Sequence, residues 1–232
     1  MATDQGKIVN RGEGTPSRTE LDAFLADIGA RKTSARGRLI FGLDATASRE
    51  NTWDTAAELQ AEMFREVAGG GGLDMQLVFY RGINQCQSTP WTSDANHLTW
   101  LMSKVMCQSG HTQIEKILKH VEKEDRLLKV AALTFVGDAC EENPHVLVQA
   151  AHELGRIGVP AFMFQEGDDR EAKRVFQDIA RVSRGAYCRF DPGAAHQLAE
   201  LLRAVAVYAV GGLRALTHRR DAGAIKLLSQ LK

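Results

Sequence analysis

Asp44, Thr46 and Ser48 place one acid and two hydroxyls at alternate positions, directly after the apolar run 39–43. Carboxylate and hydroxyl oxygens are hard ligands that suit Mg²⁺ or a similar divalent cation. A turn that leaves a strand can aim alternate side chains at one point. The segment therefore predicts part of a metal site, whose remaining oxygens must come from other parts of the chain.

Two later segments carry such oxygens. Asp138 follows the apolar run 130–136, and Thr112 comes after Ser109, Gly110 and His111 where a helix is predicted to begin. In open α/β sheets, ligands bind outside the carboxyl ends of the strands, and a helix start adds free backbone N–H groups there. The predicted metal ligands are Asp44, Thr46, Ser48, Thr112 and Asp138.

The pattern of the chain predicts a sheet that can bring these residues together. From Arg38 onward, short apolar runs alternate with helical patterns, which is typical of βαβ units around a mainly parallel sheet. The predicted strands are 38–44, 75–81, 83–89, 130–136, 159–165 and 186–190. The predicted helices are 52–68, 94–106, 112–124, 144–156, 170–182 and 194–210.

The gap between the second and third strands is too short for a helical crossover, so we expect a hairpin with one short antiparallel edge strand. The predicted fold class is α/β, a mainly parallel sheet that packs against helices. Polar residues 1–17 are expected to form a flexible tail, and 18–35 an amphipathic helix and linker. Residues 36–210 form the predicted domain, and 211–232 an amphipathic segment that docks on it.

The composition excludes several classes of function. Lysine plus arginine number 29 and aspartate plus glutamate number 29, so nothing favours nucleic acid as a partner. The apolar runs are shorter than the roughly 18 residues of a membrane span, and the N-terminus does not read as a signal peptide. The four cysteines form no Cys-x-x-Cys pair, which argues against a zinc cluster. We therefore expect a cytoplasmic protein without a membrane span.

Together, the motifs resemble the von Willebrand factor type A (VWA) domain family, over about residues 36–210, in the manner of its stand-alone intracellular prokaryotic members. The family's metal-ion-dependent adhesion site (MIDAS) is written Asp-x-Ser-x-Ser, followed by a distant Thr and a distant Asp. Asp44, Thr46 and Ser48 match the first motif, and Thr112 and Asp138 match the two later positions. Thr46 replaces the first serine, and Gly137-Asp138 stands where the family commonly has Asp-Gly.

The resemblance implies a Rossmann-like VWA fold, which is a doubly wound, mainly parallel sheet with one short antiparallel edge strand and helices on both faces. It also implies a non-enzymatic function in protein–protein interaction. A magnesium ion, or Mn²⁺ or Ca²⁺, would coordinate an acidic side chain of a protein partner, and small members of the family work beside an ATPase or in a larger complex. Two alternatives remain open. One is a metal-assisted hydrolase or phosphotransferase with Glu141 or Glu142 as the base, and the other is a scaffold with a degenerate, metal-free site.

Overall fold

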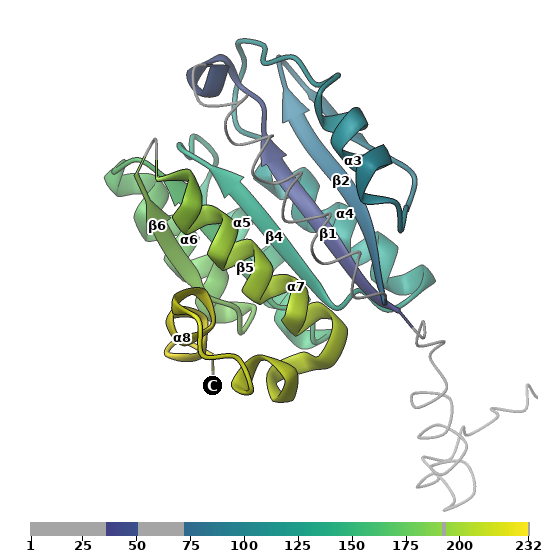
Figure 1. The fold of residues 1–232 in the computed structure, drawn as a ribbon. Helices are drawn as coiled ribbons and strands as arrows, with labels where there is room; N and C mark the ends of the chain where they lie inside the picture. The colour runs from purple at the N-terminus through teal and green to yellow at the C-terminus, as the bar shows by residue number, and fades with distance from the viewer. Residues whose placement is uncertain (1–35, 51–71, 192–193, 232) are drawn as a thin grey trace, which may run out of the picture. The chain divides into compact units, whose positions relative to one another are not determined.

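The computed structural model of the protein describes residues 36–50, 72–191 and 194–231. Within them, six strands form one sheet in the order β3-β2-β1-β4-β5-β6 (Figure 1). The strands are β1 (Gly37–Asp44), β2 (Leu73–Arg81), β3 (Gln85–Ser88), β4 (Ala132–Gly137), β5 (Ala161–Glu166) and β6 (Tyr187–Phe190). Three predicted segments lie outside the described residues: the tail 1–17, the helix and linker 18–35, and the helix 52–68.

All neighbouring strands are parallel except β2 and β3, which are antiparallel. A turn of three residues joins these two, and Gly82 and Asn84 in it have positive φ angles of 57° and 66°. Glycine and asparagine adopt this left-handed conformation more readily than other residues. The predicted doubly wound sheet with one short antiparallel edge strand is therefore confirmed.

Helices cover both faces of the sheet (Figure 1). They are α3 (Ala95–Met102), α4 (Ile114–Leu127), α5 (Pro144–Arg156), α6 (Arg170–Val182), α7 (Ala195–Thr217) and α8 (Ala222–Leu228), with a short 3-10 turn η1 (Ala47–Arg49) after β1. One buried cluster joins the sheet to α3, α7 and α8, and a second joins it to α4, α5 and α6. The central strands are buried on both faces because each face packs against helices.

The helices α5 and α6 have the predicted bounds. Asn143 and Asp169 cap them, each accepting a hydrogen bond from a backbone N–H of the first turn. The other helices differ from the prediction. Helix α3 stops at Met102 rather than at 106, and α7 continues to Thr217 rather than ending at 210.

The C-terminal segment lies against the open edge of β6. Helix α7 is broken at Gly212, where φ is 64°, and α8 follows with Leu227 fully buried. Beyond α8, the side-chain amide of Gln230 donates to Tyr187 O (2.8 Å) and accepts from Tyr187 N (2.9 Å). One side chain thus makes both hydrogen bonds that a neighbouring strand would make at this position.

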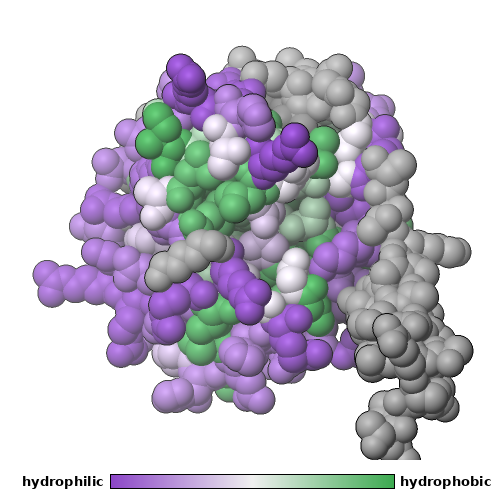
Figure 2. All heavy atoms as spheres, turned by 90° about the horizontal axis from the view of Figure 1, so that it is seen from below, coloured by the Kyte–Doolittle hydropathy of each residue, from purple (hydrophilic) through white to green (hydrophobic). Residues whose placement is uncertain are grey.

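Figure 2 shows the molecule from below, which is the side on which the parallel strands begin. Hydrophobic side chains reach the surface there in patches between hydrophilic ones. Val210 and Leu213, around the break in α7, are among the exposed apolar side chains of the described chain. The predicted metal ligands belong to the other side, where the parallel strands end.

Candidate functional site

The ends of β1, β2 and β4 bring acidic and hydroxyl groups together. Asp44 is the last residue of β1 and pairs in register with Tyr80 of β2. Asp138 directly follows β4, the neighbour of β1 on its other side. A Cβ atom added to Gly137 would lie 2.8 Å from the ring of Phe135 in the same strand, so a side chain here would have to displace this buried ring. It would also lie 3.4 Å from Asp44 Cβ, an ordinary contact distance between the ends of β4 and β1.

The carboxylate of Asp44 is completely buried and held from both sides. Its Oδ1 accepts from Thr46 N (2.8 Å), and its Oδ2 accepts from the Tyr80 hydroxyl (2.8 Å). Burial raises the pKa of Asp44, hydrogen bonds from Thr46 partly offset the rise, and the nearby charge of Asp138 adds to it. Each carboxylate oxygen has two lone pairs, so both retain capacity for a further interaction.

The hydroxyls of Thr46 and Ser48 lie together in the turn after β1. Thr46 Oγ1 and Ser48 Oγ are 3.0 Å apart and share a hydrogen bond. Thr46 is buried, whereas Ser48 is exposed. The pair therefore leads from the buried carboxylate of Asp44 toward the surface.

Asp138 carries the feature that most favours a bound cation. Its Oδ1 is buried and has no hydrogen-bond partner among the described residues. Thr134 Oγ1 is also buried without a partner, but it is a neutral hydroxyl within β4. A buried carboxylate oxygen is costly to leave unpaired, and native structures rarely do so without a ligand, water or ion.

Thr112 joins the site through the loop that follows β4. Its Oγ1 accepts from Glu141 N (3.0 Å), and its backbone N donates to Glu141 Oε2 (3.3 Å). The loop that contains Asp138 is thereby fixed to the segment before α4. His111 Nδ1 also lies 3.0 Å from Glu141 Oε2, and both of these side chains are largely exposed.

Glu142 explains why α4 begins at Ile114 rather than at the predicted residue 112. Its carboxylate accepts from Ile114 N and, at 2.9 Å, from Glu115 N. A carboxylate at a helix N-terminus satisfies free N–H groups and stabilises the helix dipole. Thr112 therefore lies in the irregular segment before the helix, and its hydroxyl is not part of the first helical turn.

Backbone hydrogen bonds bind the loops around the site to one another. Gln108 N donates to Ala45 O (3.0 Å), and Gly82 N donates to Gln108 O (3.3 Å). A Cβ atom at Gly110 would lie 2.0 Å from Gly82 O, so this close approach requires glycine. The predicted helix 94–106 ends early. Residues 103–105 still donate to carbonyl groups of α3, whereas Gln108 pairs with the loops after β1 and β2.

The donor set fits a hard divalent cation. Asp44 and Asp138 would supply two carboxylates, and Thr46, Ser48 and Thr112 would supply hydroxyls. The described residues contain no group of three or more His, Cys, Asp or Glu side chains arranged to hold a metal. Three of the five predicted ligands are hydroxyls, which do not count toward such a group, so binding of a cation by this set stays a prediction.

The alternative base residues and the thiol near the site have other partners. Glu141 and Glu142 are both engaged with backbone N–H groups between Thr112 and Glu115. Burial is the largest effect on Glu142 and raises its pKa. Burial also raises the pKa of the Cys140 thiol to about 11, which leaves little thiolate near neutral pH.

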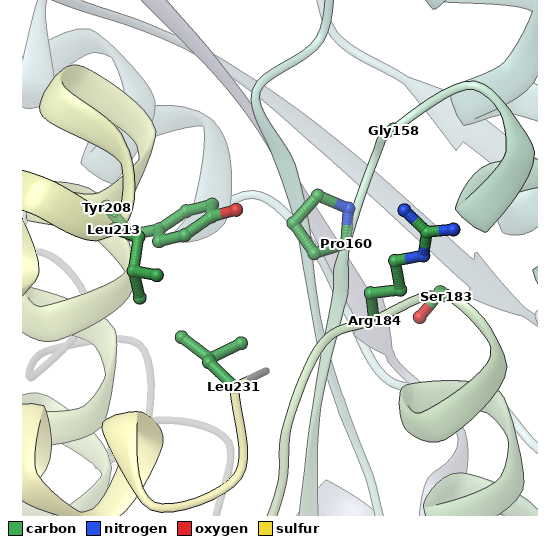
Figure 3. A pocket seen from close by; sticks show the side chains of 7 residues that line it. All are labelled: Gly158, Pro160, Ser183, Arg184, Tyr208, Leu213 and Leu231. Carbon is green, nitrogen blue, oxygen red and sulfur yellow. The ribbon is translucent and has the colours of Figure 1, made fainter.

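Two pockets of the described chain lie away from these residues. One, of about 200 Å³, is lined by Tyr208, Leu213 and Leu231 on one side and by Ser183 and Arg184 on the other (Figure 3). The second, of about 630 Å³, lies along β6 and the end of α6. Neither of these two pockets is lined by any predicted metal ligand.

Three residues near the site were not predicted from the sequence. Tyr80 donates to Asp44, and its place at the end of β2 beside β1 is the signal that could have identified it. Arg49 and Glu166 form a buried ion pair of 2.9 Å between the turn after β1 and the end of β5. Nothing in the sequence distinguishes these two charges from ordinary surface residues.

No protein-family model and no curated protein matches this sequence. Solved structures share its fold. The vWF domain of the type V pili tip protein Mfa5 from Porphyromonas gingivalis has a TM-score of 0.61 at 10% identity, covering 82% of this chain and 98% of that one. The VWA domain of SpRpn10 has a TM-score of 0.57 at 12% identity, covering 70% and 95%.

An aerotolerance-related membrane protein from Bacteroides fragilis, with multiple mutations to serines, has a TM-score of 0.54 at 18% identity, covering 69% of this chain and 95% of that one. At such identities the likeness concerns the fold. The chain therefore has a VWA-like fold, as the resemblance of its motifs predicted. No helix in the described part of the chain is long and apolar enough to cross a bilayer.

Proposed function

We propose that this domain binds a protein partner through a divalent cation, with Mg²⁺ as the first candidate and Mn²⁺ or Ca²⁺ as others. Asp44, Thr46, Ser48, Thr112 and Asp138 would hold the ion. When bound, the cation would supply an open coordination position for a carboxylate of the partner. The single observation that carries the proposal is the buried, unpartnered Oδ1 of Asp138 close to the buried carboxylate of Asp44.

The residues of the chain have distinct parts in this function. Tyr80 and the Thr46 backbone hold the Asp44 carboxylate in one orientation. Glu141, fixed to Thr112, holds the loop of Asp138 against the start of α4. Ser48 lies at the surface, where a partner side chain can reach the site. A preformed arrangement of this kind reduces the entropy lost on binding.

The fold of the neighbours supports a role in protein interaction rather than catalysis. Solved structures with this fold include a pilus adhesin from Lactobacillus rhamnosus GG and a pili tip protein from Porphyromonas gingivalis. A hydrolase is less well supported because Glu141 and Glu142 already bind backbone N–H groups. An ATPase or a larger complex remains the expected kind of partner, inside the cytoplasm.

One observation favours the metal-free scaffold as a second candidate. Both oxygens of Asp44 already accept hydrogen bonds within the chain, so its carboxylate is satisfied without an ion. In that case the same surface would bind a partner without any cation. The two candidates differ in whether binding depends on metal.

Calorimetric titration with Mg²⁺ and with Mn²⁺ tests the proposal. We expect saturable binding to the wild type and a loss of binding in Asp44→Ala and Asp138→Asn. Asp178→Asn is a matched control, because Asp178 is an exposed carboxylate on α6 that pairs with Arg181. Absence of binding to the wild type would exclude the metal-dependent function. Partner capture that persists in chelator would support the scaffold instead.

A further inference from the structure

Arg49 is the largest of the fully buried side chains, with a relative exposure of 1%. It directly follows Ser48 and is the last residue of η1. Burying a guanidinium is costly unless its charge is paired and its N–H groups are hydrogen-bonded. Its position inside the fold therefore requires specific partners.

Those partners belong to two other strands. Arg49 Nη1 donates to Val136 O of β4 (3.2 Å), and Nη2 lies 2.9 Å from Glu166 Oε2 at the end of β5. The backbone of Arg49 also closes the turn, because its N donates to Thr46 O (3.1 Å). One residue thus ties the turn after β1 to the ends of both β4 and β5.

The turn that carries the two hydroxyls is consequently held at both of its ends. Asp44 fixes the first end by accepting from Thr46 N, and Arg49 fixes the second end. Glu166 neutralises the guanidinium, so the pair adds no net charge beside Asp44 and Asp138. The contribution of Arg49 is therefore one of orientation rather than of charge.

We propose that Arg49, anchored by Glu166 and Val136 O, is the positioning residue of the candidate site, holding the Thr46 and Ser48 hydroxyls in place beside Asp44. The effect on cation affinity rests on the proposed function, whereas the effect on the turn does not. Arg49 does not itself touch the cation or the partner carboxylate.

The test replaces the whole pair, so that no buried charge remains alone. Arg49→Met with Glu166→Leu exchanges the pair for apolar side chains of similar size, a change that buried ion pairs often tolerate. Arg38→Met with Glu124→Leu is the matched control. This second Arg–Glu pair (3.2 Å) is also largely buried, but it involves the start of β1.

Hydrogen exchange in chelator reports on the turn independently of any metal. We expect the amides of Thr46 and Arg49 to exchange about tenfold faster in the Arg49/Glu166 variant, and within about twofold of the wild type in the control. Unchanged exchange of these amides, or equal acceleration in both variants, would overturn the proposal.

Calorimetry with Mn²⁺ is the second readout. We expect the affinity for Mn²⁺ to fall about tenfold or more in the Arg49/Glu166 variant, because residues that orient metal ligands without contacting the metal have effects of this size. The affinity of the control variant should be unchanged. If the wild type binds Mn²⁺ and the variant binds it equally well, the positioning role is wrong while the proposed function stands. If the wild type does not bind Mn²⁺, the proposed function fails and hydrogen exchange alone decides the role of Arg49.

Arg49→Lys covers the case in which the double variant does not fold. Lysine keeps the charge but cannot bridge two acceptors with a planar fork. We expect a melting temperature close to that of the wild type. The backbone amides of residues 46 and 49 should nevertheless exchange faster than in the wild type. Wild-type exchange rates in a folded Arg49→Lys protein would contradict the proposal.

Discussion

The two ends of β1 each bury an arginine and a glutamate, yet they use polar groups in different ways. At the start of β1, Arg38 pairs with Glu124 and lies over the ring of Trp91, 3.8 Å from its centroid. Trp91 Nε1 donates to the same carboxylate (2.7 Å), and Arg38 also donates to Leu128 O. The polar groups of Arg38, Glu124 and Trp91 thus find their hydrogen-bond partners within the protein.

At the other end of β1, one buried polar group lacks a hydrogen-bond partner among the described residues. Arg49 and Glu166 are paired, and Asp44 is satisfied, but Asp138 Oδ1 has no partner in the described part of the chain. Fully satisfied networks stabilise a fold, whereas a buried group left open is a cost that natural proteins keep for a ligand. The start of β1 thus completes its own polar network, whereas its end leaves one acid open for the proposed ligand.

The largest expected difference between the two ends comes from removing one acid. Glu166→Gln leaves Arg49 charged and buried, so we expect the free energy of unfolding to fall by about 3–5 kcal/mol. Glu124→Gln should cost less, about 1–3 kcal/mol, because Arg38 keeps the Trp91 ring and Leu128 O. Urea unfolding measures both. Equal losses would show that the two networks are equivalent.

Trp91→Leu tests whether the first network is purely structural. The substitution removes the donor to Glu124 and the ring beneath Arg38, so we expect a loss of about 2–3 kcal/mol in urea unfolding. Cation affinity should not change. Trp100→Leu is the control, because Trp100 is 54% exposed on α3. A weaker affinity for Mn²⁺ in folded Trp91→Leu would contradict the separation of the two ends.

Asp138→Asn should have opposite effects with and without metal. In chelator, removing one of two neighbouring acids relieves repulsion with Asp44, so we expect stability to rise by about 0.5–1 kcal/mol. With Mg²⁺ in excess, the wild type should gain stability through binding and the variant should not. Thermal melts in the two buffers provide the measurement. A destabilised variant in chelator would mean that Asp138 is a structural residue.

The smallest effect is a pH dependence at the start of β1. Burial lowers the pKa of His120 from its ordinary value of 6.5, with Lys123 acting in the same direction and Glu124 opposing it. The unfolded chain, in which His120 has its ordinary pKa, therefore takes up the proton at a higher pH than the folded chain does. The stability contributed by neutral His120 is fully present above pH 6.5 and is lost as the pH falls through the lowered pKa of the folded protein.

We therefore expect protonation of His120 to lower the free energy of unfolding by less than about 1 kcal/mol as the pH falls from roughly 7.5 to 5.5. His120→Gln keeps a donor for Gln76 Oε1, which His120 contacts at 2.8 Å, and should flatten this part of the profile in urea unfolding. His145→Gln, at an exposed position on α5, should leave it unchanged. A steeper profile in His120→Gln would show that the assignment is wrong.

The sequence predicted those elements whose ends are set locally. Helices α5 and α6 begin after their own caps, Asn143 and Asp169, and their bounds agree with the prediction. The start of α4 depends on Glu142, which is distant in sequence and becomes a cap only in the folded chain. Helix α7 passes the predicted stop at 210 because Gly212 only breaks it locally and Leu216 beyond the break is buried.

The candidate site also contains residues that could be predicted from the sequence and residues that could not. Residues that follow strands, such as Asp44 and Asp138, could be placed at one edge of the sheet from the chain pattern alone. The groups that hold them come from elsewhere. Tyr80 and Glu166 act through contacts across strands, and Arg49 reads as a surface charge until its partners are seen. Contacts of this kind depend on strand order, which hydrophobic patterns do not specify.

The amide of Gln230 has a consequence for the behaviour of the protein in solution. An open strand edge invites pairing with the edge of another molecule. Because the side chain of Gln230 is hydrogen-bonded to both backbone groups of Tyr187, it hinders such self-association at this position. Shortening the C-terminus before this residue would expose both backbone groups of Tyr187 while leaving the predicted metal ligands in place. A truncated protein would thus keep the candidate site but be more prone to self-association through β6.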